Sequence, residues 1–117
     1  MDFTVTFLQI FMVSAFYVGP ILLFLVLIIA LTGLLIGRRE GWSRSDALYY
    51  AFITATTVGY GDFRPSLAKT KFAAIIIALL GIVLTGIIVA VALKSLEVAL
   101  IAHYDIDSII KSVKSVL

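Results

Sequence analysis

Two glycines, a tyrosine and an aspartate lie close together in the segment TATTVGYGDF, residues 54–63, between two long apolar runs. Gly59 and Gly61 allow backbone conformations that other residues adopt only at a steric cost. Such a loop can form a turn, bind a phosphate or give the backbone a special shape for another purpose. A dinucleotide-binding loop needs a third glycine in the pattern G-x-G-x-x-G, and Arg64 stands at that place. Phosphate binding is therefore disfavoured.

The composition of the chain is typical of a membrane protein. Of its 117 residues, 62% are hydrophobic and 14% are charged, and the mean hydropathy is +1.18. Soluble domains carry about 25% charged residues. The formal net charge of +2 gives no reason to expect a nucleic acid as partner, and the absence of cysteine excludes disulfides and thiolate metal sites. We find no catalytic constellation in the sequence and do not expect an enzyme.

Two long runs contain no charged residue, from Phe3 to Gly37 and from Phe72 to Leu93. A helix that crosses the hydrocarbon of a bilayer needs about 20 residues. The second run therefore predicts one spanning helix at 71–94. The first run is too long for one straight span, and Gly19-Pro20 favours a boundary inside it because proline suits the first turn of a helix. We predict an interfacial or re-angled segment at 1–17 and an outer helix at 18–37, with one long, tilted and kinked helix as the alternative.

A short helix is predicted between the two spans, at 45–56. Ser43 or Ser45 can cap its first turn, where Asp46 is favourable at the positive end of the helix dipole. The helix is too short to cross a bilayer, so it enters the membrane and returns, which requires neighbouring protein to satisfy its backbone. The glycine-containing loop at 57–62 follows it.

The C-terminal residues, 95–117, are predicted to form an amphipathic helical tail. Lys94 and Glu97 lie one turn apart and are expected to form an ion pair. The lone His103 could sense internal pH, or it is an ordinary surface histidine. Apolar residues recur at helical spacing over fewer than two heptads, which suggests a coiled coil without establishing one. They are Ile106, Ile109, Ile110, Val113, Val116 and Leu117.

The sequence TTVGYGD, residues 56–62, resembles the signature of the potassium channels. With one loop between two spans, residues 21–93 resemble the two-transmembrane bacterial members of that family. The resemblance implies an all-α membrane protein in which two transmembrane helices flank a re-entrant pore helix and a selectivity-filter loop. It also implies a homotetramer in the inner membrane of a prokaryote, with an extracellular filter mouth and a cytoplasmic tail. The implied pore domain is 18–94.

The resemblance also implies roles for the residues of the loop. K⁺ must exchange its water shell for other oxygens, which rings of backbone carbonyls can supply. In this family the filter carbonyls bind K⁺ ions and no other cofactor is needed. The side chains of Val58 and Tyr60 are expected to pack away from the ions, while Gly61 shapes the backbone and Asp62 tethers it through Tyr49 or Tyr50. The ion-binding residues are Thr57, Val58, Gly59 and Tyr60.

Four further features follow from the same resemblance. Ile53 stands where some relatives carry a glutamate behind the filter, so we expect filter stability and inactivation to differ. Arg64 stands where some relatives bind external quaternary ammonium ions, and four arginines should repel them. Gly81 and Gly86 are gating hinges or allow close helix packing. The residues expected to line the inner cavity and gate are Ile82, Thr85, Val89, Ala90 and Leu93.

The resulting function is passive conduction of K⁺ across a lipid bilayer by the pore-forming subunit of a K⁺-selective channel. Two alternatives stay open: a weakly selective cation channel, and a non-conducting regulatory subunit with the pore fold. One pattern opposes the implied orientation, because basic residues gather between the spans and the positive-inside rule would place them in the cytoplasm. They are Arg38, Arg39, Arg44, Arg64, Lys69 and Lys71. The gating stimulus does not follow from the sequence.

Overall fold

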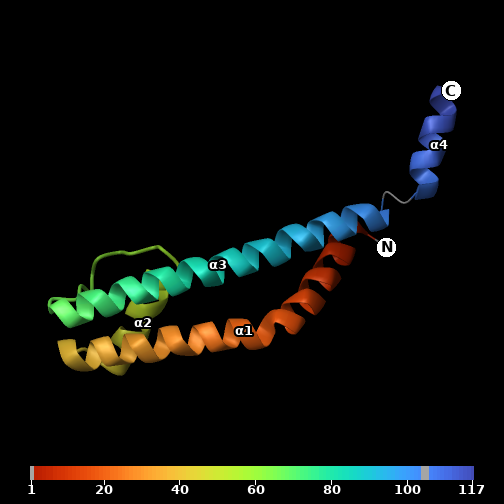
Figure 1. Ribbon diagram of the computed structural model, residues 1–117. Coiled ribbons are helices and arrows are strands. Elements are labelled where there is room, and N and C mark those ends of the chain that lie inside the picture. The colour runs from red at the N-terminus through yellow and green to blue at the C-terminus, as the bar shows by residue number, and fades with distance from the viewer. Residues whose placement is uncertain (1, 104–105) are drawn as a thin grey trace. The chain divides into compact units, whose positions relative to one another are not determined.

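Four helices make up the described part of the computed structural model, which comprises residues 2–103 and 106–117 (Figure 1). They are α1 (Phe3–Glu40), α2 (Arg44–Ala55), α3 (Ala68–His103) and α4 (Ile106–Val116). None of the residues in those two ranges forms a β-strand. Both α1 and α3 are long and apolar enough to cross a membrane. The predicted all-α membrane fold with two such helices around a short one is therefore confirmed.

Helix α1 differs from the segmentation that we predicted at Val18. It is one continuous helix from Phe3 to Glu40 with Pro20 inside it, so the alternative of a single long helix describes the backbone better. Proline removes one backbone hydrogen bond, and long membrane helices tolerate this loss where neighbouring groups satisfy the freed carbonyl. A Schellman motif ends the helix. Gly41, just after its last residue, has a φ of +77°, and the N–H of the next residue, Trp42, donates a hydrogen bond to the Gly37 carbonyl at 2.8 Å.

Helix α2 begins one residue earlier than predicted, and Ser43 rather than Ser45 is its N-cap. The Ser43 hydroxyl accepts a hydrogen bond from the Asp46 N–H at 3.1 Å. This bond satisfies one of the backbone donors that every helix N-terminus leaves free. With 12 residues, α2 is about 18 Å long and cannot cross a bilayer.

Helix α3 extends beyond the range predicted for the inner helix at both ends. It begins at Ala68 and continues past Lys94 to His103, since no helix-breaking residue interrupts the sequence there. The first part of the predicted tail thus belongs to α3, and α4 forms its last part. Residues 104 and 105 of that tail lie outside the described residues. The predicted ion pair of Lys94 with Glu97 is confirmed, at 3.5 Å.

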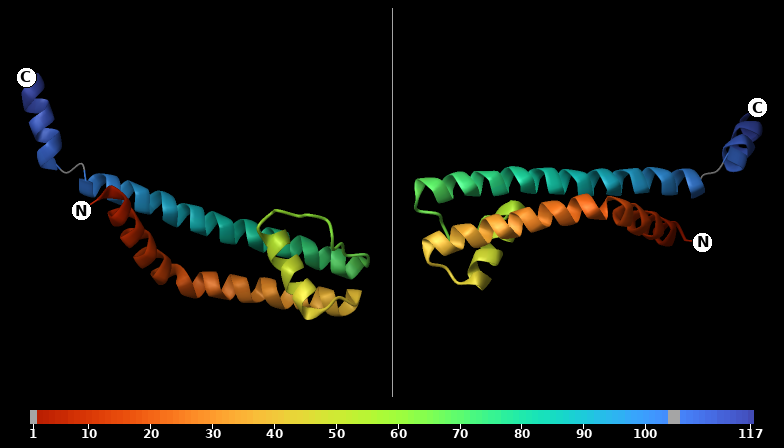
Figure 2. Two further views of the ribbon diagram at one scale, coloured as in Figure 1. Left: turned by 180° about the vertical axis from the view of Figure 1, so that it is seen from behind. Right: turned by 60° about the horizontal axis from the view of Figure 1, so that its bottom comes forward.

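The chain divides into two compact units, one formed by residues 19–87 and the other by residues 1–18 and 88–117. In the unit of residues 19–87, α2 lies beside α1 and α3 in all three views (Figures 1 and 2). Small residues allow this approach: a Cβ on Gly33 would collide with Ala51, and one on Gly37 would collide with Ala47. The buried cluster of this unit consists of Ile29, Ile36, Tyr50, Ala51, Ala55 and Ile77.

The other unit contains the beginning of α1 and the end of α3. The Thr6 hydroxyl and His103 Nε2 lie 2.9 Å apart, and the rings of Phe3 and His103 meet edge to face with centroids 5.7 Å apart. Ser95 is buried and donates its hydroxyl hydrogen to the Val91 carbonyl at 2.7 Å. His103 is thus a packed, hydrogen-bonded residue and not a free surface histidine.

Candidate functional site

The backbone of the glycine-containing loop, residues 57–62, alternates between two conformations. Thr57, Gly59 and Gly61 have positive φ angles of 64°, 56° and 82°, and the intervening Val58 and Tyr60 do not. In an ordinary extended strand, successive carbonyls point to opposite sides, so an inversion at every second residue turns them toward one side. The predicted glycine positions, Gly59 and Gly61, are two of the three inverted residues.

Thr57 is the inverted residue that sequence reasoning missed. A positive φ is rare for a β-branched side chain and costs about 1–3 kcal/mol, so it persists only where the surroundings enforce it. Two hydrogen bonds fold the loop onto the end of α2: Thr57 N–H donates to the Thr54 carbonyl and Gly59 N–H to the Ile53 carbonyl, both at 3.1 Å. These bonds use carbonyls that the C-terminus of α2 would otherwise leave unpaired.

The side chains of the loop are exposed in the single chain. Val58 is 50% exposed and Tyr60 is 70% exposed, although the resemblance implies that both pack behind the filter. Thr57, Gly59, Gly61 and Asp62 are exposed as well. The packing expected for Val58 and Tyr60 is therefore not supplied by the described part of this one chain.

Asp62 lies beside Tyr49, one of the two tyrosines proposed as its partner. The pKa of Tyr49 is raised, first by partial removal from water and then by a hydrogen bond to the Asp62 carboxylate and the negative charge of that group. The pKa of Tyr50 is also raised, chiefly by burial, and the side chain that acts on its hydroxyl is that of Thr54 and not that of Asp62. Asp62 Oδ1 also accepts a hydrogen bond from the Phe63 N–H at 3.2 Å, so the turn after the loop closes on the same carboxylate.

Four aromatic rings form a cluster next to the loop. The ring of Trp42 meets Tyr50 at a centroid distance of 5.0 Å and Phe63 at 5.3 Å, and Phe63 meets Tyr49 at 6.1 Å, all edge to face. Such pairs contribute about 0.5–1.5 kcal/mol each beyond the area they bury. The sequence analysis assigned no role at this loop to Trp42 or to Phe63. The sequence pattern that could have identified these two residues is the concentration of aromatic residues on both sides of the glycine-containing loop.

Glu40 connects the two long helices and was also missed. Its carboxylate accepts hydrogen bonds from Ser66 N–H at 2.8 Å, Ser66 hydroxyl at 2.7 Å and Leu67 N–H at 3.2 Å, and from the Thr70 hydroxyl at 2.6 Å. Glu40 lies beyond the charge-free run of α1, and these bonds, led by that from Thr70, lower its pKa from 4.5 to about 2. A glutamate in the last turn of a helix is locally unfavourable, which is the signal that it has a tertiary partner.

The two predicted hinge glycines differ in their surroundings. A Cβ on Gly81 would collide with the backbone carbonyl of Ala55, at the end of α2, whereas a Cβ on Gly86 would meet no atom within 4 Å. Gly81 therefore lies where α3 packs closely on α2. Ile53 is half-buried near this contact. The residues predicted to line the cavity are all exposed on α3: Ile82, Thr85, Val89, Ala90 and Leu93.

Arg64 lies just after the loop, and its Nε donates a hydrogen bond to the Gly61 carbonyl at 3.0 Å. The positive charge is thus held at the end of the inverted segment. Among residues 2–103 and 106–117, no group of three or more His, Cys, Asp or Glu side chains is arranged to hold a metal ion. The oxygens gathered at this site are those of the backbone.

Comparison with known proteins agrees with this geometry. Residues 21–98 match the model of a protein family described as "Ion channel". The chain is 47% identical over 45 residues to human "Potassium channel subfamily K member 17", which covers 38% of the chain and 14% of that protein. It is 34% identical over 58 residues to "Potassium channel protein 1" of Methanocaldococcus jannaschii, covering 50% of the chain and 17% of that protein. The chain thus spans only a small part of these relatives, and no solved structure gives a significant match.

Proposed function

The chain belongs to the ion channel family, and on this premise we propose that it is the pore-forming subunit of a K⁺-selective channel. The observation that carries the proposal is the alternation of positive φ angles at Thr57, Gly59 and Gly61. Carbonyls aligned on one side of a strand can replace the water shell of K⁺. The carbonyls of Thr57, Val58, Gly59 and Tyr60 are the proposed K⁺ ligands, with the Thr57 hydroxyl as the innermost oxygen.

The functional unit in this proposal is a homotetramer. One strip of carbonyls cannot surround an ion, and closed cyclic symmetry is the usual way in which identical chains complete such a ring. The exposure of Val58 and Tyr60 supports this step, because large apolar side chains next to a strained loop need a cover. Neighbouring subunits would provide it. The C-terminus of α2, with its partial negative charge, would then face the central axis and favour a cation there.

Support behind the filter comes from Asp62 and Tyr49. The interaction of the Tyr49 hydroxyl with the Asp62 carboxylate would hold the outer end of the strip against α2, and the aromatic cluster positions Tyr49 in turn. Gly61 allows the turn that brings Asp62 to this place. Tyr50 and Ile53 contribute packing on the same helix and not a second tether.

Opening is assigned to α3, in line with the resemblance. The exposed residues Ile82, Thr85, Val89, Ala90 and Leu93 recur at helical spacing and would line the inner cavity, where apolar rings can close a pore by dewetting. Of the two glycines, Gly86 is the proposed hinge because nothing packs against it, while Gly81 serves the contact with α2. The filter mouth is assigned to the extracellular side of a prokaryotic inner membrane and α4 to the cytoplasm.

A flux measurement tests the proposal. The full chain is reconstituted into liposomes, and uptake of radioactive rubidium, a K⁺ substitute, is compared with uptake of radioactive sodium. We expect rubidium uptake that greatly exceeds sodium uptake, and loss of both in Gly59→Ala, because alanine is strained at a φ of +56°. Equal uptake of the two ions would indicate a weakly selective channel, and no uptake would indicate a non-conducting subunit. A protease-accessible tag after Leu117 tests the orientation separately.

A further inference from the structure

Arg64 holds a positive charge against the end of the inverted segment. Its Nε donates a hydrogen bond to the Gly61 carbonyl at 3.0 Å, and a Cβ on Gly61 would lie 3.7 Å from Nε and from one terminal nitrogen of the guanidinium group. In the described part of the chain, the one ion pair joins Lys94 with Glu97, so no carboxylate there pairs with Arg64. The Arg64 side chain is exposed, and its charge therefore faces the water at the loop.

Asp62 does not neutralise this charge by direct contact, although it is only two residues away. Its carboxylate lies beside the hydroxyl of Tyr49 on α2 and accepts a hydrogen bond from the Phe63 N–H. Asp62 and Arg64, both described residues, form no ion pair. The two opposite charges thus have different partners: the carboxylate contacts α2, and the guanidinium group covers the backbone of the loop.

The position of the guanidinium group is restricted from two sides. Pro65 follows Arg64, and the residue before a proline is disfavoured in the helical conformation. The hydrogen bond to Gly61 fixes the other end of the side chain. Gly61 adjoins Tyr60, the outermost of the proposed K⁺ ligands, so the charge lies within about 10 Å of the entrance to the carbonyl strip, which is the screening length at about 0.1 M salt. Ions that enter there must feel it.

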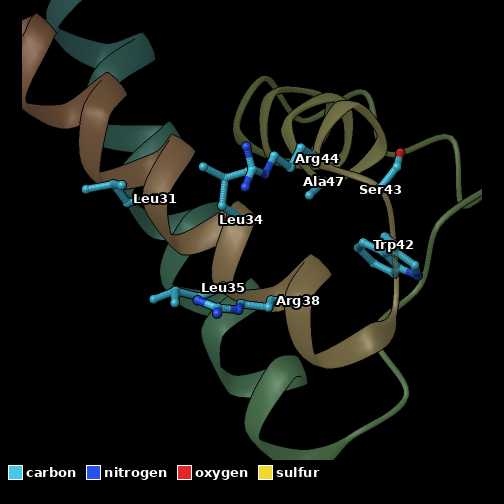
Figure 3. Close-up of a pocket in the computed structure, with 8 residues that line it drawn as sticks. All are labelled: Leu31, Leu34, Leu35, Arg38, Trp42, Ser43, Arg44 and Ala47. Carbon is cyan, nitrogen blue, oxygen red and sulfur yellow. The ribbon is translucent and has the colours of Figure 1, made fainter.

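The other basic residues near the loop in sequence have different surroundings. Arg38 and Arg44 line a pocket of about 640 Å³ where the end of α1 meets the beginning of α2 (Figure 3). Arg39 and Lys69 line a second pocket, formed by α1 and α3. Arg44 is separated from the loop by the length of α2, about 18 Å for its 12 residues at about 1.5 Å each. Arg64 is the basic residue that contacts the loop itself.

We propose that Arg64 is a specificity-determining residue of the pore, which discriminates among cations by their charge. The inference rests on the proposed homotetramer, in which four guanidinium groups surround the entrance. The filter carbonyls select an ion by replacing its water shell, whereas the ring of positive charge acts earlier, on ions still in water. It lowers the entry of K⁺ from the filter-mouth side by some factor, and the entry of a divalent cation by the square of that factor, because electrostatic energy is proportional to the charge of the ion.

The size of the effect follows from Coulomb's law and from screening by salt. Four unit charges about 10 Å from an ion in water should lower the entry of K⁺ about threefold at about 0.1 M salt, and the entry of Ba²⁺ about ninefold. At about 1 M salt the screening length is about 3 Å, so both factors should approach one. K⁺ that enters from the opposite end meets the ring only after it has crossed the filter. The ring therefore lowers the inward current and not the outward current when entry limits both.

Single-channel recording tests the proposal. The full chain is incorporated into bilayers of phosphatidylcholine, which carries no net charge and so adds no surface potential of its own. The K⁺ concentration is kept low on both sides, so that entry limits the current, and impermeant N-methyl-D-glucamine chloride sets the ionic strength. Ba²⁺, a divalent cation of nearly the size of K⁺, is added on the filter-mouth side. Its entry is read from the rate at which it interrupts the inward current, and the outward current is the internal control.

Variants separate the charge of Arg64 from its contribution to structure. At about 0.1 M salt, Arg64→Gln should raise the inward unitary current about threefold and the rate of interruption by Ba²⁺ about ninefold, with the outward current unchanged. Arg64→Lys keeps the charge and should stay close to the wild type in both rates. The matched control Arg44→Gln removes a charge about 18 Å from the loop, beyond the screening length, and should also behave like the wild type.

The wild-type protein provides a second test that does not depend on folding of a variant. Raising the ionic strength from about 0.1 M to about 1 M should increase its inward K⁺ current and its rate of interruption by Ba²⁺ by the same two factors. Equal factors for K⁺ and Ba²⁺ would overturn the proposal in favour of steric obstruction. So would unchanged rates in Arg64→Gln or at high salt, or an Arg64→Lys protein that behaves like Arg64→Gln. A wild-type protein that conducts no K⁺ at all would instead refute the proposed function, and this inference with it.

Discussion

The hydroxyl of Thr70 donates a hydrogen bond of 2.6 Å to the carboxylate of Glu40, which precedes it by 30 residues in the sequence. Glu40 ends α1 and Thr70 lies in the first turn of α3, so this contact joins the two long helices at the ends that α2 and the glycine-containing loop connect. The same carboxylate also accepts hydrogen bonds from the N–H groups of Ser66 and Leu67, the two residues that directly precede α3. One side chain thus closes the segment that contains α2 and the filter.

The first prediction concerns the pH dependence of stability. Because the pKa of Glu40 is lowered from 4.5 to about 2 in the folded chain, its contribution is present above pH 4.5 and is lost as the pH falls toward 2. The midpoint of thermal denaturation of the reconstituted protein should therefore decrease over this interval. In Glu40→Gln that decrease should be smaller, and the midpoint at neutral pH should be lower than in the wild type.

Glu97→Gln is the matched control for this experiment. It also removes a carboxylate, but within residues 2–103 and 106–117 that carboxylate is paired with Lys94 alone, in an exposed ion pair, and such pairs contribute little. Its denaturation midpoint should follow that of the wild type at each pH. A Glu40→Gln protein with the wild-type pH profile would show that the hydrogen bonds of Glu40 do not stabilise the fold.

The second prediction separates packing from hinge motion. Gly81→Ala would place a Cβ against the carbonyl of Ala55, so α2 or α3 must shift, and we expect a loss of about 1–3 kcal/mol in stability. Gly86→Ala meets no atom within 4 Å and should be tolerated, with altered gating because alanine stiffens the helix. Denaturation of the two variants in detergent, together with single-channel recording, measures both effects. Equal stability of the two would refute the close contact at Gly81.

The third prediction distinguishes the two tyrosines of α2. Tyr49→Phe removes the hydroxyl that is hydrogen-bonded to Asp62, so the outer end of the loop should be held less firmly and current should decay several-fold faster during sustained opening. Tyr50→Phe removes a hydroxyl that lies beside Thr54 on the same helix and not beside Asp62, and its current should decay as in the wild type. Macroscopic current decay at constant voltage gives the comparison. Faster decay in Tyr50→Phe alone would reverse the assignment.

The fourth prediction concerns the external mouth. The charge of Arg64 is held next to the Gly61 carbonyl, so in the proposed tetramer four such groups should repel external tetraethylammonium. Arg64→Tyr should make external block stronger, since an aromatic ring attracts quaternary ammonium ions. The block is read from the current as a function of tetraethylammonium concentration. Tight block of the wild-type protein would show that the guanidinium groups do not surround the ion path.

Much of the fold follows from the sequence, because charge-free runs and capping residues are local signals. The two long helices, the short helix between them and the inverted backbone at Gly59 and Gly61 are of this kind. The first and last residues of the helices were less predictable. Pro20 was expected to begin a helix and lies inside one, because a long apolar helix can accommodate the loss of a single hydrogen bond.

Residues whose role depends on distant partners were harder to find. Glu40 acts through Ser66, Leu67 and Thr70, which no local pattern places beside it. The positive φ of Thr57 could not be predicted from its residue type, since only the surrounding hydrogen bonds enforce it. The choice between Tyr49 and Tyr50 likewise required the direction of each side chain from α2.

The central claim is that backbone carbonyls of Thr57–Tyr60 select K⁺, and a bilayer recording with K⁺ on one side and Na⁺ on the other tests it most directly. The reversal potential should lie far from zero, toward the equilibrium potential of K⁺. The Gly59→Ala protein, whose backbone is strained at that position, should carry no selective current. A reversal potential near zero in the wild-type protein would contradict the account.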